Sequence, residues 1–553
     1  MEAFVPFIPT VGVLSLFMLI WACIEVGSND AANLVNAVFG SRVLRRNVAV
    51  LIAGLFVVVG ANFSSPVMDT VRKGIFDLSF LDSYGAIVIF VSVYLVNTVL
   101  LYSFSAYGLP VSTTATLVFA LAGGALGISG NSAVVDWPTM GRVTAAILAS
   151  ILLSGLAGFL LQRIFRGAMR TDARKPSLVL LHGPWITGII LASLSWFMVV
   201  KGMNAMPIVR FIQKSMFNEL GTGGFLLLLW GGFTLLTHII LAMTGRWGIK
   251  YLFHVTSILG MICMAFAFGQ NDLANCASPG LAIWMIWQKG LQAGSSTPIP
   301  DFALLICGLL MAWGMTTKRA HRVTRAEVNT GSQQSRVSLY APRWCMWLAR
   351  FFINKNNDGI PEVAPPPGRD DTGKKIHYDP LRASVILAVG ACVIALASGL
   401  GLPVSTTYVS FAAVIATGWG DRVFSRGKAE VKIGRALWVV TSWFLGMGIA
   451  LVATGAVALF IYHLGLIGLV GALFANLFAR YYFYKKGEAH EELYHGKKPG
   501  SASSSVPGTS LPQVDTTAQG LRNTAVAVTS VSAPVKLSVT MPPKMSAAPV
   551  RKS

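Results

Sequence analysis

The sequence predicts an all-α polytopic membrane protein. Of its 553 residues, 54% are hydrophobic and only 12% are charged, whereas soluble globular chains carry about 25% charged residues. Apolar stretches recur along the chain, several of them long enough for a span of ~20 residues. They lack the ~10-residue alternating strands of an outer-membrane barrel. We therefore expect about ten to twelve transmembrane helices.

In chain order, these stretches form two similar blocks joined by further helices. We assign a first transmembrane repeat to 1–130, linking transmembrane helices to 131–250, and the first part of a second repeat to 251–317. A polar, basic stretch at 318–381 is expected to be a soluble, cytoplasmic insertion, because basic loops stay on that side. The second part of the second repeat and the terminal helices follow at 382–484. The Ser-, Thr- and Pro-rich tail at 485–553 is expected to be disordered.

The formal net charge of +21 would suggest nucleic-acid binding in a soluble protein. Here Lys and Arg lie mainly between apolar stretches, which is typical of cytoplasmic loops. Lipid is therefore the expected environment, and we expect no nucleic-acid partner. The six Cys and eight His residues show no metal-ligand, disulfide or catalytic spacing. We expect neither an enzyme nor a bound cofactor.

Two polar motifs occur twice, in the same order. The first reads Gly27-Ser28-Asn29-Asp30-Ala31-Ala32-Asn33 and returns as Gly269-Gln270-Asn271-Asp272-Leu273-Ala274-Asn275. The second reads Leu109-Pro110-Val111-Ser112-Thr113-Thr114 and returns as Leu402-Pro403-Val404-Ser405-Thr406-Thr407. Polar groups in apolar segments are costly, so this duplication predicts a solute path. An odd number of crossings between the copies would make an inverted repeat, with discontinuous helices and the site at the membrane midplane.

The Asn-Asp motif predicts a cation site. Asp30 and Asp272 supply anionic oxygens, and neutral amide oxygens come from Asn29, Asn33, Asn271 and Asn275. Such oxygens suit Na⁺, with Asp30 and Asp272 as its ligands, or a proton. Glu25 lies four residues before Asn29, on the same helix face, and is a further candidate. The alternatives are helix packing through Asn and, for Glu25, a local hydrogen bond.

The Pro-Val-Ser-Thr-Thr motif predicts an anion site. A Pro that starts a helix leaves backbone N–H groups free beside the hydroxyls that follow. Ordinary N-capping by Ser or Thr is the alternative. The candidate ligands are Ser112, Thr113, Thr114, Ser405, Thr406 and Thr407. Neither motif contains Lys or Arg, so a cation must balance a dehydrated anion. Because the motifs supply no positive charge of their own, we expect the anion to be transported together with a cation, that is, by symport.

Gly-x-Asn-Asp-x-x-Asn followed by Pro-Val-Ser-Thr-Thr in both halves resembles the PiT family of inorganic phosphate transporters. The resemblance covers about residues 10–130 and 255–445. It implies an inverted-repeat carrier that moves inorganic phosphate with Na⁺ or H⁺ across a plasma membrane or bacterial inner membrane. By matching position, the six hydroxyl residues would bind phosphate together with Asn33 and Asn275. Cation coupling would use Asn29, Asp30, Asn271 and Asp272, and Glu25 is our own addition to that set.

The sequence also departs from this family. Ala115 and Tyr408 stand where a His usually follows Ser-Thr-Thr, and Phe268 stands where a His often precedes the second Asn-Asp motif. The helix after the first motif often carries a Glu, and none occurs in 56–61. The coupling ion therefore stays open between Na⁺ and H⁺. A sulfate or other oxyanion permease of the same fold, a non-transporting phosphate sensor and a homodimeric assembly also stay open.

Overall fold

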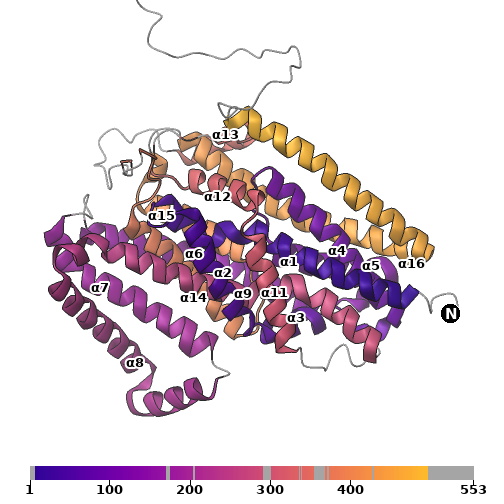
Figure 1. Ribbon diagram of the computed structural model, residues 1–553, viewed down its shortest axis with the longest axis horizontal. Coiled ribbons are helices and arrows are strands. Elements are labelled where there is room, and N and C mark those ends of the chain that lie inside the picture. Colours follow the sequence, from indigo (N-terminus) through magenta and orange to yellow (C-terminus); the bar gives the residue numbers. More distant parts are fainter. Residues whose placement is uncertain are drawn as a thin grey trace, which may run out of the picture. The chain divides into compact units, whose positions relative to one another are not determined.

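The computed structural model describes residues 7–169, 175–203, 206–289, 300–334, 337, 339–353, 368–369, 373–425 and 429–495 (Figure 1). Within these residues the chain forms helices and no β-strand. Eight of the described helices are long and apolar enough to cross a membrane, or up to ten when each of two bent helix pairs counts as one span. The expected all-α class is confirmed.

The first block contains five helices. They are α1 (Phe7–Gly40), α2 (Arg46–Ala61), α3 (Ser65–Lys73), α4 (Ser83–Ala106) and α5 (Thr113–Ser129). The chain bends by 71° between α2 and α3. Asp82 caps α4 by accepting from the Gly85 N–H, and Ser112 caps α5 by accepting from the Ala115 N–H. Such caps satisfy backbone donors that a helix start leaves free.

The linking segment forms three helices. They are α6 (Trp137–Met169), α7 (Pro176–Leu194), which continues as the π-helical turn η4 (Ser195–Gly202), and α8 (Pro207–Thr244). Helices α7 and α8 lie at the left of Figure 1, while α6 lies nearer the middle, packed against the later helices α15 (Thr406–Gly420) and α14 (Pro380–Gly399). Apolar side chains of α8 are largely exposed, whereas α4 is largely buried. This difference places α8 toward the lipid and α4 in the interior.

The second block repeats the order of the first. Its helices are α9 (Arg246–Lys289), α11 (Asp301–Gly314), α12 (Lys318–Thr330), α14 (Pro380–Gly399) and α15 (Thr406–Gly420). Here the chain bends by 67° between α11 and α12. Asp379 caps α14 through the Arg382 N–H, and Ser405 caps α15 through the Tyr408 N–H. The two blocks therefore share their bends and their caps.

Two further helices are α13 (Arg343–Ala349), which lies between α12 and α14 along the chain, and α16 (Ala429–His495), the last described helix. α16 is broken at Gly465, whose φ is 56°. The residues on either side of this break are each numerous enough for a span at ~1.5 Å rise per residue. Helix α16 continues into the tail that we expected to be disordered from 485, and 496–553 lie outside the described residues.

The segment expected to be a soluble insertion begins with α12. This helix packs against α1 and α4. Its buried residues recur every three or four positions, which is the period of a helix with one face in a core; they include Ala320, Val323, Thr324, Glu327 and Val328. One face of α12 is mostly apolar and buried, whereas the opposite face is basic. The first 13 residues of the segment therefore belong to the helical bundle.

Glycines allow the two blocks to cross in close contact. A Cβ on Gly27 of α1 would lie 2.0 Å from the Met311 carbonyl oxygen of α11. A Cβ on Gly314 of α11 would lie 2.2 Å from the Ile24 carbonyl oxygen of α1. Real Cβ atoms do not approach this closely, so the two helices touch backbone to backbone. Small residues permit such contacts between membrane helices.

The same reciprocal contact joins α9 and α2. A Cβ on Gly269 would lie 2.2 Å from the Val57 oxygen, and one on Gly60 would lie 2.1 Å from the Phe266 oxygen. In all four contacts the carbonyl belongs to the third residue before the partner glycine. The two crossings are therefore equivalent, as a repeat predicts; the inversion of that repeat across a membrane stays a prediction.

Gly27→Ala is expected to lower the thermal stability of the purified protein in detergent. The added methyl group would collide with backbone that cannot rotate away, and overpacking of this kind costs about 1–3 kcal/mol. The matched control is Gly155→Ala on α6, where a Cβ meets no atom within 4 Å. Equal melting temperatures for Gly27→Ala and Gly155→Ala, followed by tryptophan fluorescence, would contradict this packing argument.

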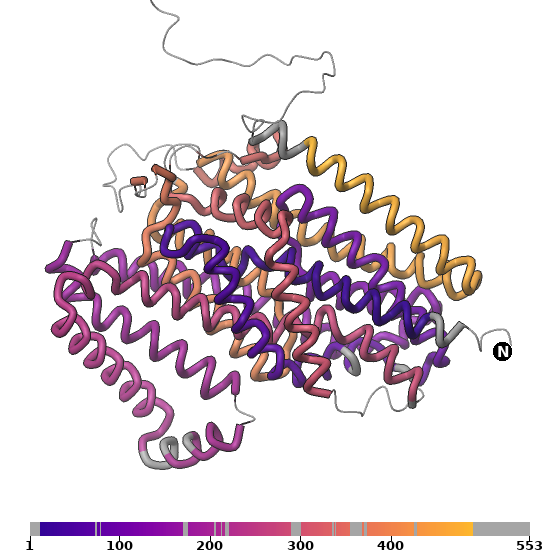
Figure 2. The backbone as a smooth tube through the Cα atoms, viewed as in Figure 1, coloured from indigo at the N-terminus to yellow at the C-terminus, as the bar shows by residue number. Residues whose placement is uncertain are grey.

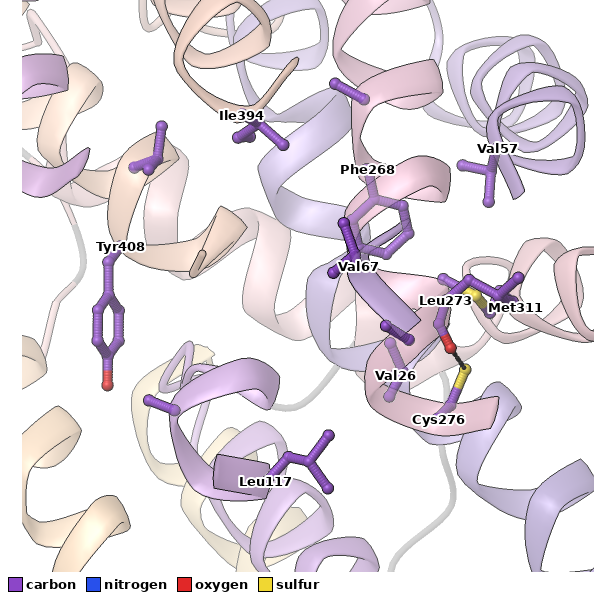
Figure 3. Close-up of a cluster of buried hydrophobic side chains, with 14 of the residues drawn as sticks. Val26, Val57, Val67, Leu117, Phe268, Leu273, Cys276, Met311, Ile394 and Tyr408 are labelled. Carbon is purple, nitrogen blue, oxygen red and sulfur yellow. Dashed lines mark hydrogen bonds between the residues drawn. The ribbon is translucent and has the colours of Figure 1, made fainter. Parts of the chain in front are cut away.

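The hydrophobic core surrounds the repeated motifs. One cluster of buried apolar side chains runs through both blocks and includes Val26 and Phe268, which directly precede the two motif glycines. Leu273 and Tyr408 belong to the same cluster (Figure 3). The trace in Figure 2 shows α1, α2 and α9 side by side, although α9 lies far along the chain. The polar motifs therefore lie inside the packed core.

Candidate functional site: two carboxylates between helix N-termini

The carboxylates of the two Asn-Asp motifs lie next to each other. Asp30 of α1 and Asp272 of α9 are both fully buried. The Thr113 hydroxyl at the start of α5 lies 3.2 Å from Asp30 Oδ2 and 3.2 Å from Asp272 Oδ1. One hydroxyl hydrogen can be donated to only one of them at a time. The structure thus brings acids from both halves of the chain to one centre, as the duplication predicts.

Asp30 is held by donors from both blocks. Its Oδ1 accepts from Thr407 Oγ1 at 2.7 Å, from Asn29 Nδ2 at 2.8 Å and from Asn33 Nδ2 at 3.2 Å. Thr407 belongs to α15 and the two Asn residues to α1. These donors orient the carboxylate and stabilise its negative charge.

Asp272 has fewer partners. Its Oδ1 accepts from Asn275 Nδ2 at 2.5 Å, besides the Thr113 hydroxyl. Among the described residues, Asp272 Oδ2 has no hydrogen-bond partner, and no described Lys or Arg forms an ion pair with either Asp. Two neighbouring buried carboxylates without a basic partner repel each other in a low dielectric. The arrangement suits a monovalent cation or a proton between them.

The second Asn of each motif reaches the opposite half of the chain. Asn33 Nδ2 lies 3.2 Å from the Thr407 hydroxyl, and Asn275 Nδ2 lies 3.0 Å from the Thr113 hydroxyl and 2.8 Å from that of Thr114. The Thr406 hydroxyl is 3.5 Å from Asn33 Nδ2. Both Asn-Asp motifs are therefore joined to the Thr pairs of the other block.

The first Asn of each motif positions the Pro-Val-Ser-Thr-Thr segment of its own block. Asn29 Nδ2 donates to the Val111 oxygen at 2.8 Å. Asn271 Nδ2 donates to the Val404 oxygen at 2.6 Å, and its Oδ1 accepts from the Val404 N–H at 3.2 Å. These bonds fix the extended residues just before α5 and α15. Helices α1 and α9 run unbroken through their motifs, so the interruption lies before α5 and α15.

Ser112 and Ser405 act as N-caps. Their Oγ atoms accept from the Ala115 N–H at 3.0 Å and the Tyr408 N–H at 3.1 Å. The capping alternative thus describes these two serines, while the neighbouring threonines contact the carboxylates and amides. Because both helices start at the carboxylate pair, the positive ends of their dipoles point toward it. This is a favourable position for an anion.

Every residue that the sequence singled out for this centre is buried. The most exposed is Asn275, at 6%. The set comprises Asn29, Asp30, Asn33, Ser112, Thr113, Thr114, Asn271, Asp272, Asn275, Ser405, Thr406 and Thr407. A solute can therefore reach the centre only after helices move apart.

Glu25 lies elsewhere, in a separate ionic cluster. Its carboxylate accepts from Arg319 Nη1 of α12 at 2.5 Å and from Arg480 Nη1 of α16 at 3.0 Å, and Trp21 Nε1 donates to it at 2.9 Å. It shares no hydrogen-bond partner with either Asp of the pair. Two guanidinium groups already balance its charge, which argues against its expected role in cation coupling.

Sequence reasoning missed a second buried acid near the site. Glu327 of α12 contacts Asn36 of α1, with Asn36 Nδ2 to Glu327 Oε1 at 2.6 Å. Glu327 lies within 318–381, the segment that the sequence predicts to be a soluble insertion. The sequence signal for Glu327 is the helical spacing of Ala320, Val323 and Val328, which form one apolar face of α12. Glu327 lies on that same face and is therefore expected to be buried. Asn36 follows Asn33 by three residues, on the same face of α1.

The chain matches a protein-family model described as the phosphate transporter family. The match covers residues 26–326 and 370–454, which is most of the chain and includes all four motif copies. The gap in the match begins within α12 and ends shortly before α14.

Individual relatives agree with this match. A protein of Pyrococcus horikoshii with the name "Putative phosphate permease" is 26% identical over 457 residues, or 80% of this chain and 94% of that protein. One of Chlamydia trachomatis with the same name is 27% identical over 445 residues, or 76% and 91%. A solved structure entitled "The sodium-dependent phosphate transporter" superposes with a TM-score of 0.60 at 22% identity, covering 83% of this chain and all of the other. At that identity the likeness establishes the fold.

Proposed function

The chain belongs to the phosphate transporter family and is an integral multi-pass membrane protein, and on this premise we propose that it takes up inorganic phosphate by cation symport. The coupling ion is Na⁺ or H⁺. The observation that carries the proposal is the pair Asp30 and Asp272, joined through the Thr113 hydroxyl at the starts of α5 and α15.

The charge of this centre explains why a cation must accompany phosphate. A dehydrated phosphate anion would meet two carboxylates with no basic side chain bound to either among the described residues. Such a complex is strongly unfavourable in a low dielectric. Na⁺ or protons bound at Asp30 and Asp272 remove that repulsion. Phosphate then binds only after the cation, which couples the two movements.

Phosphate itself would be held by neutral donors. The hydroxyls of Thr113, Thr114, Thr406 and Thr407 face the centre through their contacts with the Asn-Asp motifs. The amides of Asn33 and Asn275 add N–H donors. In this proposal Ser112 and Ser405 contribute through the helix starts that they cap. Neutral donors bind an oxyanion without trapping it as strongly as a fixed positive charge would.

The buried site indicates how transport proceeds. Because all site residues are inaccessible in this conformation, α1 and α5 must separate from α9 and α15 on one side and then on the other. The bends between α2 and α3 and between α11 and α12 are suitable hinges. Alternating access of one block against the other is the expected mechanism for a carrier built from two repeats.

Uptake of labelled phosphate into proteoliposomes tests the proposal. We expect accumulation driven by an inward Na⁺ gradient or by an inward proton gradient, and none with protein-free liposomes. Comparing the two gradients identifies the coupling ion. Equal uptake with and without both gradients would contradict symport, and phosphate binding without any uptake would favour a sensor.

Sulfate competition tests the substrate. Near neutral pH phosphate still carries protons and can donate hydrogen bonds to buried carboxylates, whereas sulfate can only accept them. Excess unlabelled sulfate is therefore expected to leave labelled phosphate uptake largely intact. Full inhibition by an equal concentration of sulfate would instead support a general oxyanion permease.

A further inference from the structure

We propose that a phospholipid with an anionic headgroup binds in an apolar groove between α6, α15, α16 and the turn Arg350–Phe352, and that its acyl chain supports the start of α15. The inference rests on the proposed function, because α15 begins at the proposed phosphate site. The groove has a volume of about 580 Å³. This volume falls within the about 300–1,000 Å³ of sites that bind small organic molecules.

The groove has a buried floor and an exposed rim, and both are apolar. Phe411 of α15 and Trp443 of α16 form part of the floor and are buried, whereas Leu152 and Leu156 of α6 form part of the rim and are exposed. Only 28% of the apolar window of α6 is buried inside the protein. The groove therefore opens toward the hydrocarbon of the membrane, where lipid chains rather than water are available to fill it.

The length of the groove suits an acyl chain. Its wall on α6 runs from Ile151 to Phe159, which is about 12 Å at ~1.5 Å per residue. One leaflet contributes about 15 Å, half of the ~30 Å hydrocarbon core. Gly155 lies in the middle of this wall, and a Cβ on it would meet no atom within 4 Å. A chain lying along α6 would therefore cross most of one leaflet without a steric obstacle.

A basic residue lies at one end of the groove. Arg163 is exposed and follows the lining residue Phe159 by four positions, on the same face of α6. Its Nη1 donates to the Gly420 carbonyl oxygen at 3.3 Å. A guanidinium carries several N–H donors in a planar arrangement that matches a phosphate group. Arg163 can therefore keep this bond and still donate to the phosphate of a lipid headgroup.

The turn at the same end adds a second Arg and an aromatic rim. Arg350 is 66% exposed and pairs with Glu430 at 3.0 Å, and Phe352 and Trp419 line the groove with exposed rings. Aromatic and basic side chains together are typical of the membrane–water interface. Arg350 lies in 318–381, which the sequence predicts to be cytoplasmic, and the cytoplasmic leaflet carries anionic lipids. An anionic headgroup complements this end of the groove.

The other end of the groove is connected to the proposed phosphate site. Trp443 stacks on Tyr408 with ring centroids 3.9 Å apart, and it meets Phe411 edge-on at 5.6 Å. Tyr408 directly follows Thr407, whose hydroxyl donates to Asp30 Oδ1. An acyl chain packed against Trp443 adds dispersion contacts on the side away from Tyr408. Lipid in the groove thus stabilises the packing that holds the first turn of α15 at the carboxylate pair.

The test measures the melting temperature of the purified protein in neutral detergent, titrated with phosphatidylglycerol or with phosphatidylcholine of the same acyl chains. We expect phosphatidylglycerol to raise it saturably and phosphatidylcholine to raise it less. Arg163→Gln should raise the phosphatidylglycerol concentration for half-maximal stabilisation about fivefold, which corresponds to ~1 kcal/mol per basic residue. Arg246→Gln removes the same charge at the exposed start of α9 and should match the wild type.

Gly155→Phe tests the groove itself. The ring would occupy the open space beside Gly155, so stabilisation by phosphatidylglycerol should be lost while the melting temperature without lipid is retained. The matched control is Gly232→Phe, because a Cβ on this exposed glycine of α8 also meets no atom within 4 Å; it should respond like the wild type. If Gly155→Phe does not fold, Gly155→Leu gives the same readout with a smaller side chain.

Equal stabilisation of the wild type and Gly155→Phe by phosphatidylglycerol would overturn the proposal, as would equal effects of the two lipids on the wild type. A wild-type dimer that Gly155→Phe converts to a monomer in size-exclusion chromatography would overturn it in favour of a second copy of the chain as the occupant.

Phosphate uptake is measured separately, in phosphatidylcholine vesicles with and without phosphatidylglycerol. Uptake by the wild type should rise with phosphatidylglycerol, and uptake by Gly155→Phe should not. Uptake without selective stabilisation by phosphatidylglycerol removes the lipid site and keeps the transporter. Selective stabilisation that Gly155→Phe abolishes, without wild-type uptake in either kind of vesicle, keeps the lipid site and removes the proposed function.

Discussion

Asp272→Asn is expected to abolish phosphate uptake while leaving the protein folded. The substitution removes the negative charge that a coupling cation balances, and the Asn side chain still accepts from Asn275 and Thr113 through its oxygen. The cation loses a buried charged partner, which costs about 3–5 kcal/mol and corresponds to more than ~100-fold in its affinity, so the uptake that depends on this cation is lost. The measurement is labelled phosphate uptake in proteoliposomes, with the melting temperature taken on the same preparation.

Asp30→Asn is expected to abolish uptake and also to lower stability. Asp30 Oδ1 accepts from Asn29, Asn33 and Thr407, and an amide has too few acceptor positions to satisfy every donor around this carboxylate. Asp272 accepts from fewer donors. The melting temperature of Asp30→Asn should therefore be lower than that of Asp272→Asn.

The control for both variants is Asp301→Asn, at the exposed first residue of α11, which should transport phosphate like the wild type. Wild-type uptake in either Asp30→Asn or Asp272→Asn would exclude the carboxylate pair as the coupling site.

The central site was predictable from the sequence because polar groups inside apolar helices must find partners. Asp30, Asp272 and the four threonines occur in two copies of the same motifs, and this duplication predicts a shared site between the two halves. The serines were ambiguous, since a capping Ser and a ligand Ser have the same local sequence. Only the backbone of α5 and α15 showed that Ser112 and Ser405 are caps.

The contacts of Glu25 come from distant parts of the chain, and its role in cation coupling stays a prediction. Glu25 and Asn29 share one face of α1, as their spacing predicts. The hydrogen-bond partners of Glu25, however, are Arg319 and Arg480, which lie 294 and 455 residues away in the sequence. Arg319 reaches it because α12 packs against α1, and Arg480 reaches it from α16, which packs against α4 and α5. No local pattern predicts these contacts. The same packing places α12, the basic first part of the predicted insertion at 318–381, inside the helical bundle. Long-range contacts, rather than helix propensity, decide which acids remain available to a cation.

The second large effect is expected for Arg166→Met, which should destabilise the protein by about 3–5 kcal/mol, as the loss of one partner in a buried ion pair does. Arg166 of α6 is 2% exposed and donates to Asp421 at 2.8 and 2.9 Å, and it also pairs with Asp379. Burial alone would raise the pKa of Asp379, but the Arg166 charge and the Arg382 N–H hold that pKa below its ordinary value.

Arg166→Lys distinguishes charge from geometry in this cluster. Lysine keeps the positive charge but lacks the planar fork that serves both carboxylates at once, so we expect a melting temperature between those of the wild type and Arg166→Met. Adding Asp421→Asn to Arg166→Met removes one of the uncompensated charges and should recover part of the loss. If Arg166→Met melts like the wild type, the ion pairs do not hold α6 to the ends of α14 and α15. Failure of Asp421→Asn to recover stability would point to lost packing of the long Arg side chain instead, because that loss does not depend on charge.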